Sequence, residues 1–212
     1  MVRAAVHRWL LGPIAKPAVF ALALLPLIWL FYAAASDRLG ANPAEALVRA
    51  TGDWSIRSLC LVLLITPLRV VAGWPALARL RRMLGLFVYF YVLLHFLAYG
   101  WLDMGLDLGD IARDIAKRPF IWVGFTALVL LTPLALTSWN AAIRALGPTR
   151  WRNLHRLVYG VAVLAVLHFF WMRAGKRNFT EVAIYGAILA ALLGWRVWRR
   201  FSRPKTRPET DR

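Results

Sequence analysis

The sequence predicts an all-α polytopic membrane protein, a six-transmembrane-helix bundle with both termini in the cytoplasm. Of its 212 residues, 60% are hydrophobic and only 17% are charged, which is too apolar for an ordinary soluble domain. Six apolar runs are each long enough to cross a hydrocarbon core of roughly 30 Å. Basic residues stand between these runs, a pattern that indicates membrane orientation rather than nucleic-acid binding.

The apolar runs define the domain organisation. They are Ala18 to Ala35, Ser55 to Val71, Met83 to Leu102, Pro119 to Leu136, Leu154 to Trp171 and Thr180 to Trp198. Residues 1–17 are then a basic leader, 18–198 the membrane domain and 199–212 a basic tail, which we expect on the anionic inner leaflet. The first run could also be a signal peptide, but its 18 residues exceed the usual apolar region of roughly 7–15, so we expect a retained helix.

The charges orient the bundle. Most of the 27 Lys and Arg residues lie in the leader, between the second and third runs, between the fourth and fifth, and in the tail. The other side carries most of the acidic residues, four of them between Asp103 and Asp114. By the positive-inside rule, both termini are cytoplasmic. Most of the tryptophans fall near the ends of the runs, as expected for residues at the membrane interface.

Two of the four histidines, His95 and His168, lie inside the third and fifth runs. Both runs point outward, and the histidines lie about 18 Å and about 21 Å along them, at similar depth. Titratable groups inside a membrane normally have a partner or a function. Two neutral imidazoles at one depth are the axial ligands of a low-spin haem iron, and aromatic residues flank both. The sequence therefore predicts a bis-histidine haem site towards the outer face.

His155 is not part of the site formed by His95 and His168. It lies about 20 Å below His168 and points about 140° away on an ideal helix, so the two cannot bind one iron. It marks either an inner cofactor site or a basic anchor at the interface. In the inner-site interpretation, Arg82 and Arg152 hold haem propionates or a flavin phosphate. An internal repeat with an offset of 73 residues aligns His95 with His168 and Arg82 with His155.

Other functions fit less well. The rival class is a proton or metal-ion transporter that uses His95 and His168. A line of acidic residues inside the membrane would favour a transporter, whereas we expect every Asp and Glu here in a loop, at a helix end or in the tail. The single cysteine, Cys60, excludes an intramolecular disulfide and an iron–sulfur cluster. No glycine-rich dinucleotide motif is present, so we expect an electron conduit with no terminal catalytic site of its own.

The loops 103–114 and 173–177 are candidate docking surfaces for a partner.

Several segments together resemble the MsrQ (YedZ) family, the haem-binding membrane subunits of bacterial periplasmic methionine-sulfoxide reductase systems. The segments are Arg81 to Leu86, His95 to Asp103, Asp114 to Ile121, Leu134 to Ser138, Trp151 to Tyr159 and Leu167 to Phe169. The resemblance extends from the first predicted span to the sixth. His95, His155 and His168 match the three histidines of the family.

The resemblance implies a ferric-reductase-like transmembrane domain in the bacterial inner membrane, with b-type haem and FMN. Electrons would come from the quinone pool or a cytosolic flavin reductase. They would pass to a periplasmic molybdopterin subunit that reduces methionine sulfoxide in oxidised proteins, or alternatively to another acceptor such as ferric chelates. Related ferric reductases place two histidines on each of two helices. Arg82 stands where the fourth would be, which argues against a conventional inner bis-histidine haem.

Overall fold

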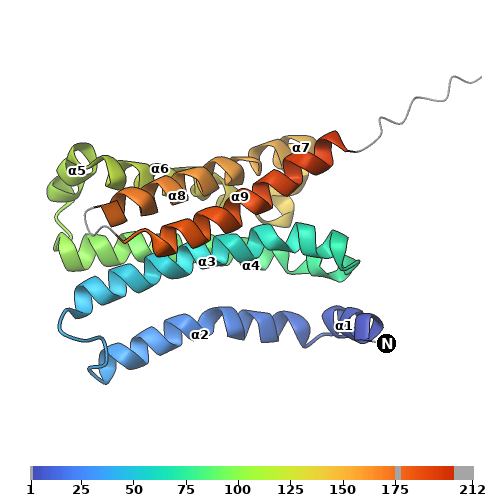
Figure 1. The fold of residues 1–212 in the computed structure, drawn as a ribbon, viewed down its shortest axis with the longest axis horizontal. Helices are drawn as coiled ribbons and strands as arrows, with labels where there is room; N and C mark the ends of the chain where they lie inside the picture. The colour runs from blue at the N-terminus through green and yellow to red at the C-terminus, as the bar shows by residue number, and fades with distance from the viewer. Residues whose placement is uncertain (1, 175–177, 203–212) are drawn as a thin grey trace, which may run out of the picture.

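Six long helices run roughly parallel along the long axis of the molecule (Figure 1). The computed structural model describes residues 2–174 and 178–202, and all regular structure within them is helical. The long helices are α2 (Ala15–Ala35), α3 (Pro43–Val71), α4 (Arg81–Ala98), α6 (Pro119–Leu136), α8 (Leu157–Ala174) and α9 (Thr180–Phe201). Each is long and apolar enough to span a membrane. The chain is a multi-pass membrane protein, which confirms the predicted fold class.

Short helices cover the two ends of the bundle. They are α1 (Val2–Leu11), η1 (Pro75–Arg79), the π-helical turn η2 (Tyr99–Asp103), α5 (Leu108–Lys117) and α7 (Asn140–Leu154). The N-terminus, α1, α7 and the end of α9 share one end of the molecule, and α5 lies at the opposite end (Figure 1). We call the end with α5 the outer end, following the predicted topology, and the end with α1 and α7 the inner end.

The bundle is built from two close helix pairs, α3 with α4 and α6 with α8. Helix α9 contacts both α3 and α8, and α4 contacts α6. Leu59, Leu63, Val88, Leu131 and Leu189 belong to the buried core where these helices meet. Helices α4 and α8 do not pack closely along their length. Because these two helices carry His95 and His168, the candidate site lies between the two pairs.

Helix α2 is separate from the other spans over much of its length (Figure 1). The hydroxyl of Tyr91 on α4 donates a hydrogen bond to the carbonyl of Ala23 on α2, at 2.7 Å. Apolar side chains such as Leu22 and Phe31 are largely exposed, as expected for a helix that faces lipid.

Helix α3 starts twelve residues before the predicted span. Its first turn has a strong local signal, because the Asn42 side chain accepts a hydrogen bond from the Glu45 backbone N–H (3.1 Å) and Pro43 occupies the first turn. The charged residues that follow this start lie before the predicted span of Ser55 to Val71. Asp53 is in the interior of α3, so the expectation that every Asp and Glu lies in a loop, at a helix end or in the tail was wrong.

The other boundaries differ less. Helix α8 begins at Leu157 rather than Leu154, and α9 continues to Phe201, so the predicted tail starts inside a helix. Residues 203–212 of that tail lie outside the described residues. Cys60 packs against the core.

Candidate functional site

His95 on α4 and His168 on α8 face each other between the two helix pairs. Their ring centroids are 6.2 Å apart and their planes make an angle of 76°. Both residues are partly buried and lie inside membrane-spanning helices. The structure therefore brings together the two residues that the sequence placed at equal depth.

Each imidazole is held by a backbone carbonyl of the partner helix in its pair. His95 Nδ1 is 2.9 Å from the Val48 carbonyl oxygen on α3, and His168 Nδ1 is 2.6 Å from that of Phe120 on α6. A carbonyl only accepts hydrogen bonds, so Nδ1 must carry the hydrogen in both rings. The Nε2 lone pair of each ring is then available to a metal. This is the usual arrangement of metal-ligating histidines.

The separation of the rings fits one metal between them. Bonds of about 2.0 Å from a metal to each Nε2, with about 1.2 Å from each nitrogen to its ring centroid, place the centroids roughly 6.4 Å apart. The observed 6.2 Å agrees with this spacing. In the described part of the chain, no three His, Cys, Asp or Glu side chains form a group that could hold a free metal ion. Two axial imidazoles are sufficient for haem, whose porphyrin supplies the other ligands.

An aromatic side chain lies beside the pair. The Phe120 ring centroid is 6.2 Å from that of His168, and the Phe96 and Phe125 rings make a tilted contact at 5.6 Å that links α4 to α6. Such an apolar shell would exclude water from a porphyrin and lower the local dielectric constant. The donors, the spacing and the surroundings all fit a haem.

A charged cluster that the sequence analysis missed lies towards the outer end, between α3, α8 and α9. It comprises Asp53, Arg57, Arg173, Glu181 and Tyr185. Arg57 Nε donates to the Tyr185 hydroxyl at 2.9 Å, and Arg173 pairs with Glu181. The Arg173 guanidinium also lies over the Phe169 ring, 5.3 Å from its centroid. Asp53 interacts with Glu181 as well as with the cations Arg57 and Arg173, so it belongs to a cluster of mixed charge.

Arg173 is only 7% exposed, so its predicted role in a basic docking loop was wrong. It belongs to the last turn of α8, where the side chain turns inward to Glu181. The rest of that predicted surface, residues 175–177, lies outside the described residues.

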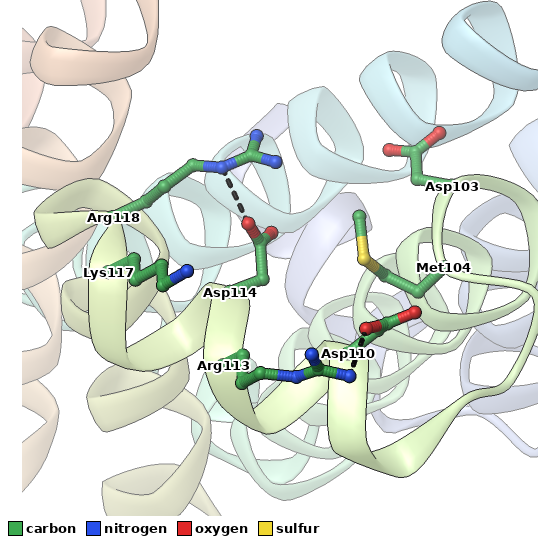
Figure 2. Close-up of a pocket in the computed structure, with 7 residues that line it drawn as sticks. All are labelled: Asp103, Met104, Asp110, Arg113, Asp114, Lys117 and Arg118. Atoms are coloured by element: carbon green, nitrogen blue, oxygen red, sulfur yellow. Dashed lines mark hydrogen bonds and ion pairs between the residues drawn. The ribbon is translucent and has the colours of Figure 1, made fainter.

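The predicted acidic surface 103–114 is a cleft of about 300 Å³ formed by η2 and α5 (Figure 2). Arg113 pairs with Asp110 and Arg118 with Asp114, both at 2.6 Å. The Tyr99 hydroxyl donates to Asp114 at 2.6 Å, which joins α5 to the start of η2, four residues after His95. The acidic side chains that line the cleft are matched by basic ones, Arg113, Lys117 and Arg118, so the cleft presents mixed charge rather than an acidic patch.

His155 lies at the inner end, at the junction of α7 and α8. Its ring stacks on Trp151 at 3.9 Å, and its Nδ1 donates to the Trp151 carbonyl at 3.0 Å. Its Nε2 is buried and has no hydrogen-bond partner within the described residues. Burial lowers the pKa of His155, and the nearby charge of Arg81 lowers it further. The backbone carbonyls of Trp151 and Leu134 act on the pKa in the opposite direction, and burial outweighs them, so the uncharged ring is favoured.

The two predicted arginine partners are not directed at His155. Arg82 donates to the Asn140 side chain at 2.7 Å and Arg152 to that of Thr149 at 3.5 Å; both guanidinium groups are at exposed positions. Arg81, one residue before Arg82, is the arginine whose charge acts on His155. The structure thus brings arginines to the inner end without joining them to the histidine.

The chain matches a family described as "Ferric reductase like transmembrane component" over residues 51–166. The fold and the paired histidines thus define a ferric-reductase-like transmembrane domain. A protein of Polaromonas naphthalenivorans named "Protein-methionine-sulfoxide reductase heme-binding subunit MsrQ" is 67% identical over 95% of this chain and 92% of its own. Proteins of the same name from Ralstonia nicotianae and Bordetella pertussis are 54% and 52% identical, over 85% and 87% of this chain and 83% and 91% of theirs.

The chain therefore belongs to the MsrQ family. No solved structure gives a significant match to it.

Proposed function

We propose that this protein carries electrons across the bacterial inner membrane through a b-type haem ligated by His95 and His168. The observation that supports this most directly is the pair of imidazoles 6.2 Å apart, each with Nδ1 held by a backbone carbonyl. The name of its relatives, a heme-binding subunit, supports the same cofactor. A haem with two imidazole ligands changes between ferric and ferrous iron without needing an open coordination position.

The residues around the haem would fix its ligands and exclude water, and both effects favour electron transfer. The carbonyls of Val48 and Phe120 keep both imidazoles in the Nδ1–H form and increase their strength as ligands. Helices α3 and α6 hold these carbonyls in place, so a change of iron charge requires little movement of the ligands. Phe96, Phe120 and Phe125 exclude water, which reduces side reactions of the iron.

A second cofactor site at the inner end is part of the proposal. His155 offers a buried, unpartnered Nε2 beside the Trp151 ring, and the charge of Arg81 acts on it. Arg82 and Arg152 add exposed positive charge at the same end of the molecule. A flat cofactor with a phosphate, such as FMN, matches an aromatic ring combined with guanidinium groups. In this proposal the inner site receives electrons from the quinone pool or a cytosolic flavin reductase and passes them to the outer haem.

The direction of transfer follows from the predicted topology. The inner end carries α1, α7 and the end of α9, and the basic residues of the sequence are concentrated in the segments at that end, so the positive-inside rule predicts that it faces the cytoplasm. The haem between His95 and His168 then lies towards the periplasm. We propose that the electrons leave for a periplasmic molybdopterin-containing methionine-sulfoxide reductase, in agreement with the name of the relatives. The mixed-charge cleft of Figure 2 is at this end and is a candidate contact surface.

Absorption spectroscopy tests the proposal. The purified protein should show a Soret band and, after reduction, a sharp alpha band. Both should be lost or strongly reduced in His95→Ala and His168→Ala. His155→Ala should keep these bands but lose the second cofactor, measured as flavin released on denaturation. A wild-type protein with no visible absorption after expression with added haem precursor would refute the electron-transfer function.

A further inference from the structure

We infer that Gly52 and Gly124 are positioning residues for the haem: each removes a side chain from a helix surface so that one ligand imidazole can lie directly on that helix. The inference rests on the proposed haem ligation by His95 and His168. It adds two residues on α3 and α6 that carry no ligand atom themselves.

Gly52 lies against His95. A Cβ atom at residue 52 would be 3.1 Å from Cε1 and 3.2 Å from Nδ1 of the imidazole, closer than such contacts normally are. The carbonyl that accepts the Nδ1 hydrogen belongs to Val48, four residues earlier on the same helix. The glycine and the carbonyl thus hold the same edge of the ring.

Gly124 repeats the arrangement more tightly. A Cβ atom there would be 2.8 Å from both Cε1 and Nδ1 of His168, and at that distance the ring or the backbone must move. The accepting carbonyl belongs to Phe120, again four residues before the glycine. The same spacing therefore occurs in both helix pairs.

Helix geometry explains the spacing. The carbonyl of residue i points along the helix towards residue i+4, whose N–H it accepts. A side chain at i+4 restricts access to the second lone pair of that oxygen. When glycine occupies i+4, an imidazole from a neighbouring helix can approach and donate its Nδ1 hydrogen. The ring is then held in one tautomer and one orientation, and Nε2 is left for the iron.

The other glycines in the described membrane spans differ. A Cβ at Gly85, Gly186 or Gly100 would make only ordinary contacts, at 3.9, 3.7 and 3.4 Å, and Gly160 and Gly194 face open space. Among these span glycines, only residues 52 and 124 would bring a Cβ closer than 3.4 Å to a neighbouring side chain. In both cases that side chain is a candidate haem ligand.

The first test uses the protein without haem. Gly124→Ala should lower the Tm of the apoprotein by roughly 4–8 °C through overpacking against His168. In a His168→Ala background the same substitution should have little effect on Tm, because the imidazole that the new methyl group would contact is absent. Gly160→Ala, on the same helix as His168, is the matched control and should change Tm by the same amount in both backgrounds, because it alters only helix propensity. An equal loss of Tm from Gly124→Ala with and without the His168 ring would overturn the contact.

The second test uses the haem-loaded protein. Electron paramagnetic resonance of the oxidised haem reports the ligand orientation, and a redox titration reports the midpoint potential. Both should change most in Gly124→Ala, less in Gly52→Ala and not at all in Gly160→Ala. Wild-type spectra and potential in both Gly124→Ala and Gly52→Ala would overturn the positioning role while leaving the haem function intact. If Gly124→Ala does not fold, the milder Gly52→Ala still decides the question.

Discussion

Arg196 on α9 donates a hydrogen bond to the backbone carbonyl of Leu63 on α3. That carbonyl has no partner in its own helix, because the residue four positions later is Pro67, which has no N–H. An unpaired carbonyl inside a membrane has no water to accept from. The guanidinium also donates to the Leu192 carbonyl and lies over the Tyr159 ring, so α9 is fixed to α3 where the proline disturbs the helix.

This relationship predicts a coupling between Arg196 and Pro67. Arg196→Met should destabilise the protein by about 1 kcal/mol, since hydrogen bonds between membrane helices contribute about that much. Part of that loss should disappear in a Pro67→Ala background, where the new N–H can reach the Leu63 carbonyl. Denaturant unfolding in detergent of the four combinations measures the coupling, with Arg200→Met as an exposed control. Identical losses in both backgrounds would contradict the explanation.

The angle between the ligand planes predicts the magnetic signature of the oxidised haem. The imidazole rings of His95 and His168 are 76° apart, close to perpendicular. Perpendicular ligand planes leave two iron d orbitals nearly equal in energy, which gives a strongly anisotropic low-spin signal with one large g value. We expect this signal in frozen oxidised protein. A rhombic signal typical of parallel planes would show that the rings rotate when haem binds.

Much of the fold could be predicted from the sequence, because length and apolar composition define a membrane span almost independently of the neighbouring helices. The depth of His95 and His168 could be predicted for the same reason, since helix rise is constant. The start of α3 could not be found from composition, because charged residues follow it. The Asn42-Pro43 signal was present, and it would have placed Asp53 inside the span.

The contacts between helices could not be predicted from the sequence. Nothing in the residue pattern shows which carbonyl the His168 ring meets, or that Gly124 lies under it, because both facts depend on the rotation of α6 against α8. The same holds for Arg173, whose position in an apparent basic loop concealed its partner on α9. A weak signal existed in the matched intervals, since Gly52 and Gly124 are offset by 72 residues and the two histidines by 73.

The buried ion pair at the outer end predicts a marked loss of stability when its cation is removed. Arg173→Met would leave Glu181 and the nearby Asp53 without that neutralising charge. We expect a loss on the order of 2 kcal/mol, below the range for fully buried pairs because Glu181 is 43% exposed. The exposed pair of Arg113 and Asp110 is the matched control, for which Arg113→Met should cost about 0–1 kcal/mol. Equal effects of the two substitutions, measured by denaturant unfolding, would contradict this account.

The buried ring of His155 predicts an acid-sensitive contribution to stability. Because burial lowers its pKa in the folded protein, the unfolded chain takes up the proton first as the pH falls. The contribution is therefore complete above the ordinary histidine pKa of about 6.5 and is lost as the pH falls through the lower, folded value. His155→Gln removes this titration. Between about pH 7.5 and about pH 5, the Tm of the wild-type apoprotein should fall more than that of the variant. His7→Gln, in the leader, should follow the wild type. Parallel pH profiles for the wild type and His155→Gln would mean that the ring is not buried as a neutral group.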